Sequence, residues 1–85
     1  MKGDRMITDV TRGSIKVEMS GRQVTVAGEM FFPENGKMGF SVYADRLVNW
    51  DFPHNSVAIS AAERQVILDV LRDGFEKGGH ILVIE

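Results

Sequence analysis

The fold is decided by residues 14–27, which read SIKVEMSGRQVTVA. On both sides of Ser20-Gly21 apolar residues alternate with polar ones, a period of two that is typical of strands with one buried face. A two-residue turn at 20–21 pairs residue 19 with 22, Val17 with Val24 and Ile15 with Val26. Apolar side chains then meet on one face of the pair, while Lys16 meets Thr25 on the other. The stretch therefore predicts a β-hairpin.

The alternation continues past this hairpin to Met30 and Phe32, with Gly28 in one inward position. The next turn lies within residues 33–37, and its length decides the next register. A two-residue loop at Asn35-Gly36 would pair inward-facing residues of one strand with outward-facing residues of the next. A three-residue loop at 34–36, with Gly36 in the left-handed region, instead pairs Met30 with Phe40 and Phe32 with Met38. We expect that loop, and an earlier strand near 6–10.

The second half of the chain changes to helical periodicity. Ser60 and Glu63 form a capping box, which marks the start of a helix. Apolar residues then recur at helical spacing on one stripe: Val66, Ile67, Val70, Leu71 and Phe75. Gly78-Gly79 is typical of a helix C-terminal cap. Residues 61–77 are therefore predicted to be helical.

After the helix, Ile81–Ile84 is apolar at every position, which favours a strand covered on both faces or placed centrally. The sequence leaves the strand order open. The predicted fold class is α+β with two layers, and residues 1–85 form one domain. An antiparallel meander packs against the 61–77 helix, with strands near 6–10, 14–19, 22–32, 38–43 and 80–84.

Composition excludes several classes of protein. The chain has no cysteine, so disulfides, thiolate metal sites and thiol nucleophiles are absent, and a reducing compartment is favoured. The longest apolar run is far shorter than the roughly 20 residues of a membrane span. A net charge of −2 does not favour electrostatic binding to the phosphates of nucleic acid. We expect a cytoplasmic protein with no nucleic-acid or membrane partner.

The search for catalytic patterns finds little. Asp51, His54 and His80 could in principle ligate a metal, but an Asp turn and a surface histidine explain them better. A triad of Ser41, His54 and Asp51 has no nucleophile elbow. Two carboxylates, Glu18 and Glu29, lie on the polar face of the hairpin, where such side chains are usually exposed to solvent. We expect no catalytic residue, metal or cofactor.

A protein-binding surface is better supported. The predicted register gathers aromatic, small and polar residues on the face opposite the core: Thr25, Ala27, Glu29, Phe31, Ser41 and Tyr43. The loop before the helix adds Trp50, Asp51, Phe52 and His54. For Trp50, burial in the core is the leading alternative. For Glu29 and Asp51, solvation and partner contact are equally good interpretations.

Several runs resemble the immunity protein 74 family of bacterial polymorphic-toxin systems. They are residues 11–18 (TRGSIKVE), Gly28-Glu29, Tyr43-Ala44-Asp45, residues 49–54 (NWDFPH) and the closing Ile84-Glu85. The resemblance covers nearly the whole chain. It implies a small cytoplasmic protein that binds and neutralises a cognate toxin domain without catalysis. It carries over no defined functional residues.

From the residues and this resemblance together, we expect toxin contact at Glu29, Phe31, Tyr43, Asp45, Trp50, Asp51 and His54. Acidic groups in such a patch would suit a basic partner. Two alternatives stay open. One is a small-molecule-binding or small enzymatic domain with a pocket near Asp51 and His54. The other is a homo-oligomer built on a free sheet edge, for instance the 6–10 strand.

Overall fold

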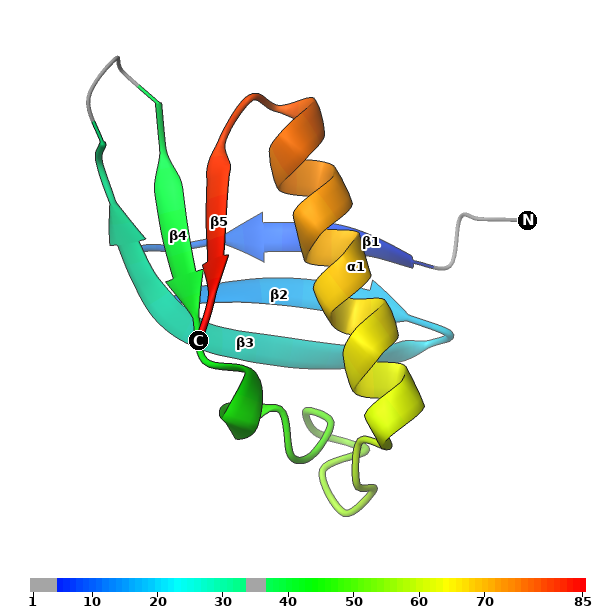
Figure 1. The fold of residues 1–85 in the computed structure, drawn as a ribbon. Helices are drawn as coiled ribbons and strands as arrows, with labels where there is room; N and C mark the ends of the chain where they lie inside the picture. Colours follow the sequence, from blue (N-terminus) through cyan, green and yellow to red (C-terminus); the bar gives the residue numbers. More distant parts are fainter. Residues whose placement is uncertain (1–4, 34–36) are drawn as a thin grey trace.

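The computed structural model describes residues 5–33 and 37–85, which form one five-stranded sheet and one long helix (Figure 1). The strands are β1 (Arg5–Val10), β2 (Ser14–Met19), β3 (Arg22–Phe31), β4 (Gly39–Val42) and β5 (Ile81–Ile84). A 3₁₀ turn at Ala44–Arg46 and helix α1 (Ala61–Lys77) lie between β4 and β5. The strand order is β1-β2-β3-β4-β5, antiparallel throughout except for the parallel pair β4–β5. The predicted α+β fold class is confirmed.

The hairpin of β2 and β3 has the predicted register. Met19 pairs with Arg22, Val17 with Val24 and Ile15 with Val26. Ser20 and Gly21 both have positive φ, 53° and 79°, as a two-residue type I′ turn requires. The hairpin is therefore fixed by local turn chemistry and by matching of the buried faces.

The long strand β3 belongs to both halves of the sheet. Its first part pairs with β2, and its residues Gly28–Phe31 pair with β4, with Met30 opposite Phe40 as predicted. A Cβ at Gly28 would collide with the Ser41 carbonyl and the Phe40 ring, so glycine allows β4 to approach here. The predicted loop at 34–36 lies outside the described residues.

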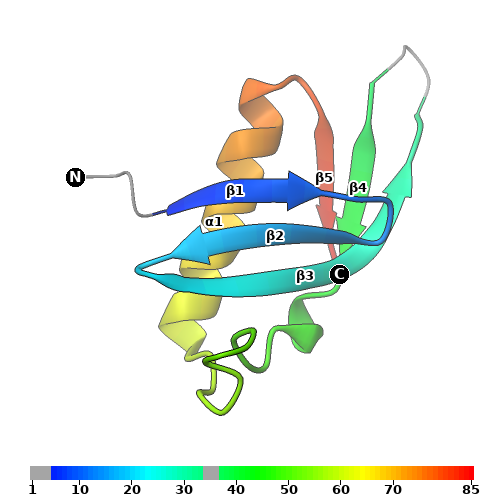
Figure 2. The same cartoon turned by 180° about the vertical axis from the view of Figure 1, so that it is seen from behind.

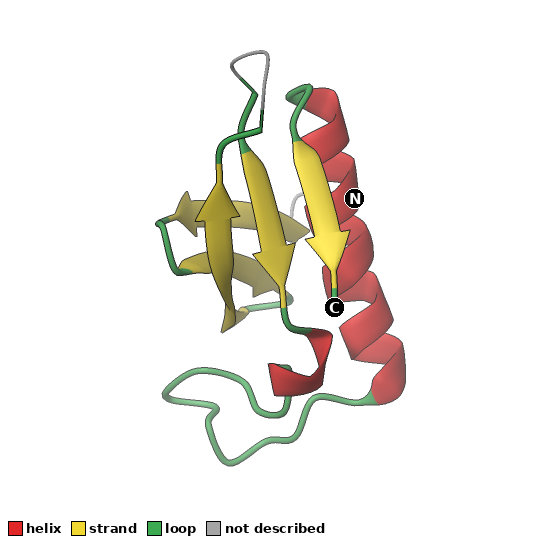
Figure 3. Ribbon diagram, turned by 60° about the vertical axis from the view of Figure 1, so that its left-hand side comes forward, coloured by secondary structure: helices red, strands yellow, loops and turns green. Residues whose placement is uncertain are grey.

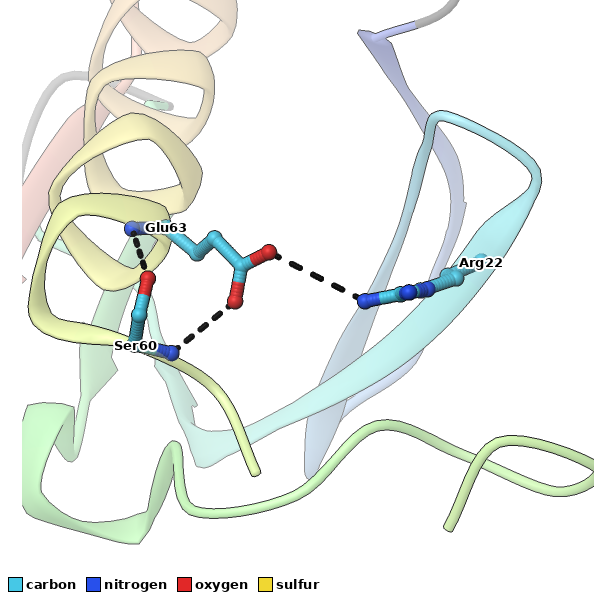
Figure 4. A network of polar contacts seen from close by, with 3 residues as sticks. All are labelled: Arg22, Ser60 and Glu63. Carbon is cyan, nitrogen blue, oxygen red and sulfur yellow. Dashed lines mark hydrogen bonds and ion pairs between the residues drawn. The ribbon is translucent and has the colours of Figure 1, made fainter. Parts of the chain in front are cut away.

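Helix α1 has the predicted bounds and caps. The Ser60 hydroxyl accepts from the Glu63 N–H at 3.0 Å, and the Glu63 carboxylate accepts from the Ser60 N–H at 2.9 Å (Figure 4). At the other end Gly79 has φ 73°, Gly79 N–H donates to Glu76 and His80 N–H donates to Phe75, which is a Schellman motif. The chain thus turns directly from α1 into β5.

The core lies between the sheet and α1, which runs behind β1, β2 and β3 in Figure 2. It contains the inward residues of the hairpin and of β4, the helix stripe, and residues from the loop before the helix. Its members are Ile15, Val17, Met19, Val24, Val26, Phe40, Val42, Leu47, Trp50, Ile59, Ile67, Leu68, Leu71 and Phe75. No helix within the described ranges is long and apolar enough to span a membrane.

The expectation for the last strand is wrong. β5 lies at the edge of the sheet beside β4 (Figure 3). Its residues Ile81 and Val83 are 39% and 40% exposed. The register explains this result, because Leu82 and Ile84 lie opposite the buried Phe40 and Val42 and so face the core. Ile81 and Val83 must then face outward, where α1 gives no cover.

Candidate protein-binding surface

Within residues 5–33 and 37–85, no helix lies on the side of the sheet turned away from α1 along β3, β4 and β5 (Figure 2). Strand register places two rows of side chains across it: Glu29, Ser41 and Val83 in one, and Phe31, Gly39 and Ile81 in the other. Tyr43 extends this side, since its N–H donates to the Ala27 carbonyl at 3.1 Å. We call Glu29, Phe31, Ser41, Tyr43, Ile81 and Val83 the outer surface.

The two aromatic rings of the outer surface, Phe31 and Tyr43, are positioned by Gly39 and Arg46. A Cβ at Gly39 would overlap the Phe31 ring, so this ring lies across the β4 backbone where only glycine leaves room. The Arg46 guanidinium lies 4.9 Å from the centroid of the Tyr43 ring, at cation–π distance. Both rings are half-buried, so they are held in place while one side stays available.

This region carries three exposed carboxylates, Glu29, Asp45 and Glu85, beside the Arg46 guanidinium that lies over Tyr43. Glu29 is exposed, and within the described ranges its carboxylate has neither an ion pair nor a hydrogen bond. The Glu85 carboxylate, beside Val83, accepts a 2.6 Å hydrogen bond from the Ser41 hydroxyl but has no cationic partner among the described residues. Asp45, next to Tyr43 in the chain, is also exposed. Unpaired carboxylates beside apolar side chains suit a partner with basic and apolar groups.

Asp51 proves to be a structural residue. Its carboxylate accepts from the Thr25 hydroxyl at 2.6 Å and from the Thr25 N–H at 3.2 Å, and its own N–H donates to the Gln23 carbonyl at 2.8 Å. These bonds provide partners for the Thr25 N–H and the Gln23 carbonyl, which lie on the part of β3 that does not pair with β4. Asp51 therefore docks the 49–58 loop onto the sheet.

Trp50 does not reach the surface, so its expected place in the toxin-facing patch is wrong. The side chain is 2% exposed and belongs to the core. The reason is the docking of its neighbour Asp51 together with the Asn49–Ala58 bridge, which turn the indole inward. Arg22 lies 5.7 Å from the indole ring and also pairs with Glu63 at 3.8 Å, linking the hairpin to the start of α1 (Figure 4).

The exposed aromatic of this loop is Phe52, at 84%. His54 is half-buried and stabilises the loop through its backbone, donating to Asp51 and accepting from Val57. Of the expected contact residues, the sheet gathers Glu29, Phe31 and Tyr43 on one side. Ile81 and Val83 were missed, although counting the register across β4 would have found them if the strand order had been known.

The alternative pocket near Asp51 and His54 gains no support. A groove of about 600 Å³ lies instead between β1 and α1, and its lining includes apolar residues such as Ile7 and Val70 as well as the charged residues Arg5, Asp69, Asp73 and Lys77. The Ser41 hydroxyl bonds Glu85 and the Asp51 carboxylate bonds Thr25, so neither is turned toward His54 as a triad would require. Within residues 5–33 and 37–85, no three acidic or histidine side chains cluster as metal ligands would.

The fold and this surface define a small α+β protein with one side of its sheet uncovered. Comparison with family models matches residues 7–85 to Immunity protein 74. The chain therefore belongs to the Immunity protein 74 family, which confirms the resemblance seen in the sequence. No curated protein and no solved structure matches the chain.

Proposed function

We propose that this protein is a cytoplasmic, non-catalytic immunity protein that neutralises a cognate bacterial toxin by binding it. The observation that carries the proposal is the family match over residues 7–85, since the family is one of immunity proteins. Neutralisation by binding requires a surface rather than a catalytic cleft, and the outer surface meets that requirement.

The composition of the outer surface supports a protein partner. Phe31 and Tyr43 are held rings of the kind that anchor interfaces, and Ile81 and Val83 add exposed apolar area beside them. Glu29 supplies an unpaired carboxylate at the same place. An acidic and apolar surface of this kind suits a toxin that presents basic residues, for example around a nucleic-acid-binding cleft.

Co-expression tests the proposal. Cells would express a toxin domain encoded beside this gene together with wild-type protein, Glu29→Lys or the matched control Glu18→Lys. Glu18 is an exposed carboxylate of β2 on the same side of the sheet. It lies opposite Gln23 of β3, distant in register from β4 and β5. We expect survival with the wild type and the control, and at least a ten-fold loss of survival with Glu29→Lys.

If wild-type protein gives no protection, the proposed function is wrong. If Glu29→Lys protects as well as Glu18→Lys, the outer surface is not the toxin-facing one. Trp50→Ala is unsuited to this experiment, because removing a buried tryptophan costs about 3–5 kcal/mol of stability and would confuse unfolding with lost contact.

A further inference from the structure

The two edges of the sheet differ in how they are protected. At the β1 edge the register shifts between Ile7 and Asp9, so one strand bulges there. Arg5, a charged residue, lies opposite the buried Met19 and so belongs to the inward-facing set. A bulge and an inward charge are the devices by which proteins prevent another strand from pairing with an edge. These two features make the described part of the β1 edge a poor template for strand addition.

The β5 edge has neither a bulge nor an inward-facing charge, and α1 packs beside it on the side away from β4 (Figure 3). Its sequence, Ile81–Ile84, contains no charge, proline or bulge, and its four residues pair in unbroken register with β4. Such an uncharged, regular edge is a template for another strand. In a protein that must stay monomeric and soluble this edge would be a liability, so we expect the functional complex to cover it.

The hydrogen bonding of β5 shows which groups are available. The Ile81 N–H donates to the Met38 carbonyl and the Glu85 N–H donates to the Val42 carbonyl. The odd-numbered residues from 81 to 85 therefore point their N–H and C=O groups toward β4. Leu82 and Ile84 therefore point their N–H and C=O groups away from β4, toward the open edge. Each is a donor and an acceptor that an extended segment could engage.

We propose that the partner toxin binds by adding an extended segment to β5 as a sixth strand. The inference rests on the proposed function and names its mode of contact. Outward side chains of the added strand would lie beside Ile81 and Val83, continuing the outer surface. A basic side chain on that strand would meet the unpaired carboxylates of Glu29 and Glu85.

A second copy of this chain fits the edge less well. In an antiparallel β5–β5 pair the two faces match when a residue lies on the two-fold axis, and the overlap of the four-residue strands is then largest with Leu82 or Val83 there. Glu85 would then lie opposite Gly79 or Ile81 of the other copy, so neither register places a cation directly opposite it. Charge complementarity therefore favours a basic partner over self-association.

Amide-resolved hydrogen exchange tests the inference on the wild-type protein, free and bound to the toxin domain encoded beside the gene. We expect the Leu82 and Ile84 amides to exchange at least ten-fold more slowly in the complex, with the β1 amides unchanged. A complex that leaves both amides unprotected overturns strand addition and leaves the proposed function intact. A toxin domain that does not bind overturns both.

Two variants and a mass measurement complete the test. Val83→Lys places a charge beside the edge and should weaken toxin binding at least ten-fold, whereas Met6→Lys, at a similarly exposed position on β1, should not. Equal affinities for the two variants would contradict the inference. Light scattering should find the free protein monomeric, and a dimer that Val83→Lys dissociates would assign the edge to a second copy instead.

Discussion

The Asp51 carboxylate accepts two hydrogen bonds from Thr25, and the loop that it docks carries Trp50 into the core and leaves Phe52 exposed. The sequence places these three residues side by side, and residue type favours burial of Trp50 without showing which contact turns it inward. Which aromatic turns inward depends on a contact between residues 26 positions apart. The sequence alone therefore leaves both Asp51 and Trp50 as candidates for the binding surface.

The docking contact can be measured by a double-mutant cycle. Asp51→Ala should lower the free energy of unfolding by about 1–3 kcal/mol, because the Thr25 N–H and hydroxyl lose their acceptor. Thr25→Ala should cost less after Asp51 has been removed, since the two residues share one interaction. Urea denaturation gives all four values.

Asp45→Ala is the matched control, because Asp45 is an exposed carboxylate of the neighbouring 3₁₀ turn. Its effect should stay within about 0.5 kcal/mol. Additive effects of Asp51→Ala and Thr25→Ala would show that Asp51 does not hold the loop through Thr25.

At the scale of elements, local signals were sufficient for most of the fold. The turn at Ser20-Gly21 and matched apolar faces predict the hairpin register, and the caps at Ser60 and Gly78-Gly79 predict the bounds of α1. β5 was misjudged because four apolar residues in a row do not distinguish a central strand from an edge strand. The position of β5 in the sheet depends on where α1 ends relative to β4, and no local sequence pattern predicts this.

The start of α1 supports a prediction that separates capping from ion pairing. Ser60→Ala should lower the free energy of unfolding by about 0.5–2 kcal/mol, because the Glu63 N–H loses its acceptor. Glu63→Gln keeps a side chain that can accept from Ser60 and removes only the charge facing Arg22, a partly exposed pair worth at most about 1 kcal/mol. Chemical denaturation of both variants checks this order, and the reverse order would assign the stability to the ion pair.

At the scale of the whole molecule, α1 covers one side of the five-stranded sheet, and no helix of the described residues covers the other side (Figure 2). The core uses the inward residues, so the outward ones are free to serve binding. The sequence predicted Glu29, Phe31 and Tyr43 on that side because alternation within β3 and β4 is local. It missed Ile81 and Val83, which join them only through the parallel pairing of β5 with β4.

Calorimetric titration of the purified toxin domain with this protein, at low and at physiological ionic strength, tests the central claim most directly. The account predicts a saturable one-to-one complex whose dissociation constant rises with salt, because carboxylates such as Glu29 attract a basic partner. Glu29→Lys should weaken the complex and reduce its salt dependence. A titration without saturable heat, or a wild-type affinity that is independent of salt and unchanged by Glu29→Lys, would contradict the account.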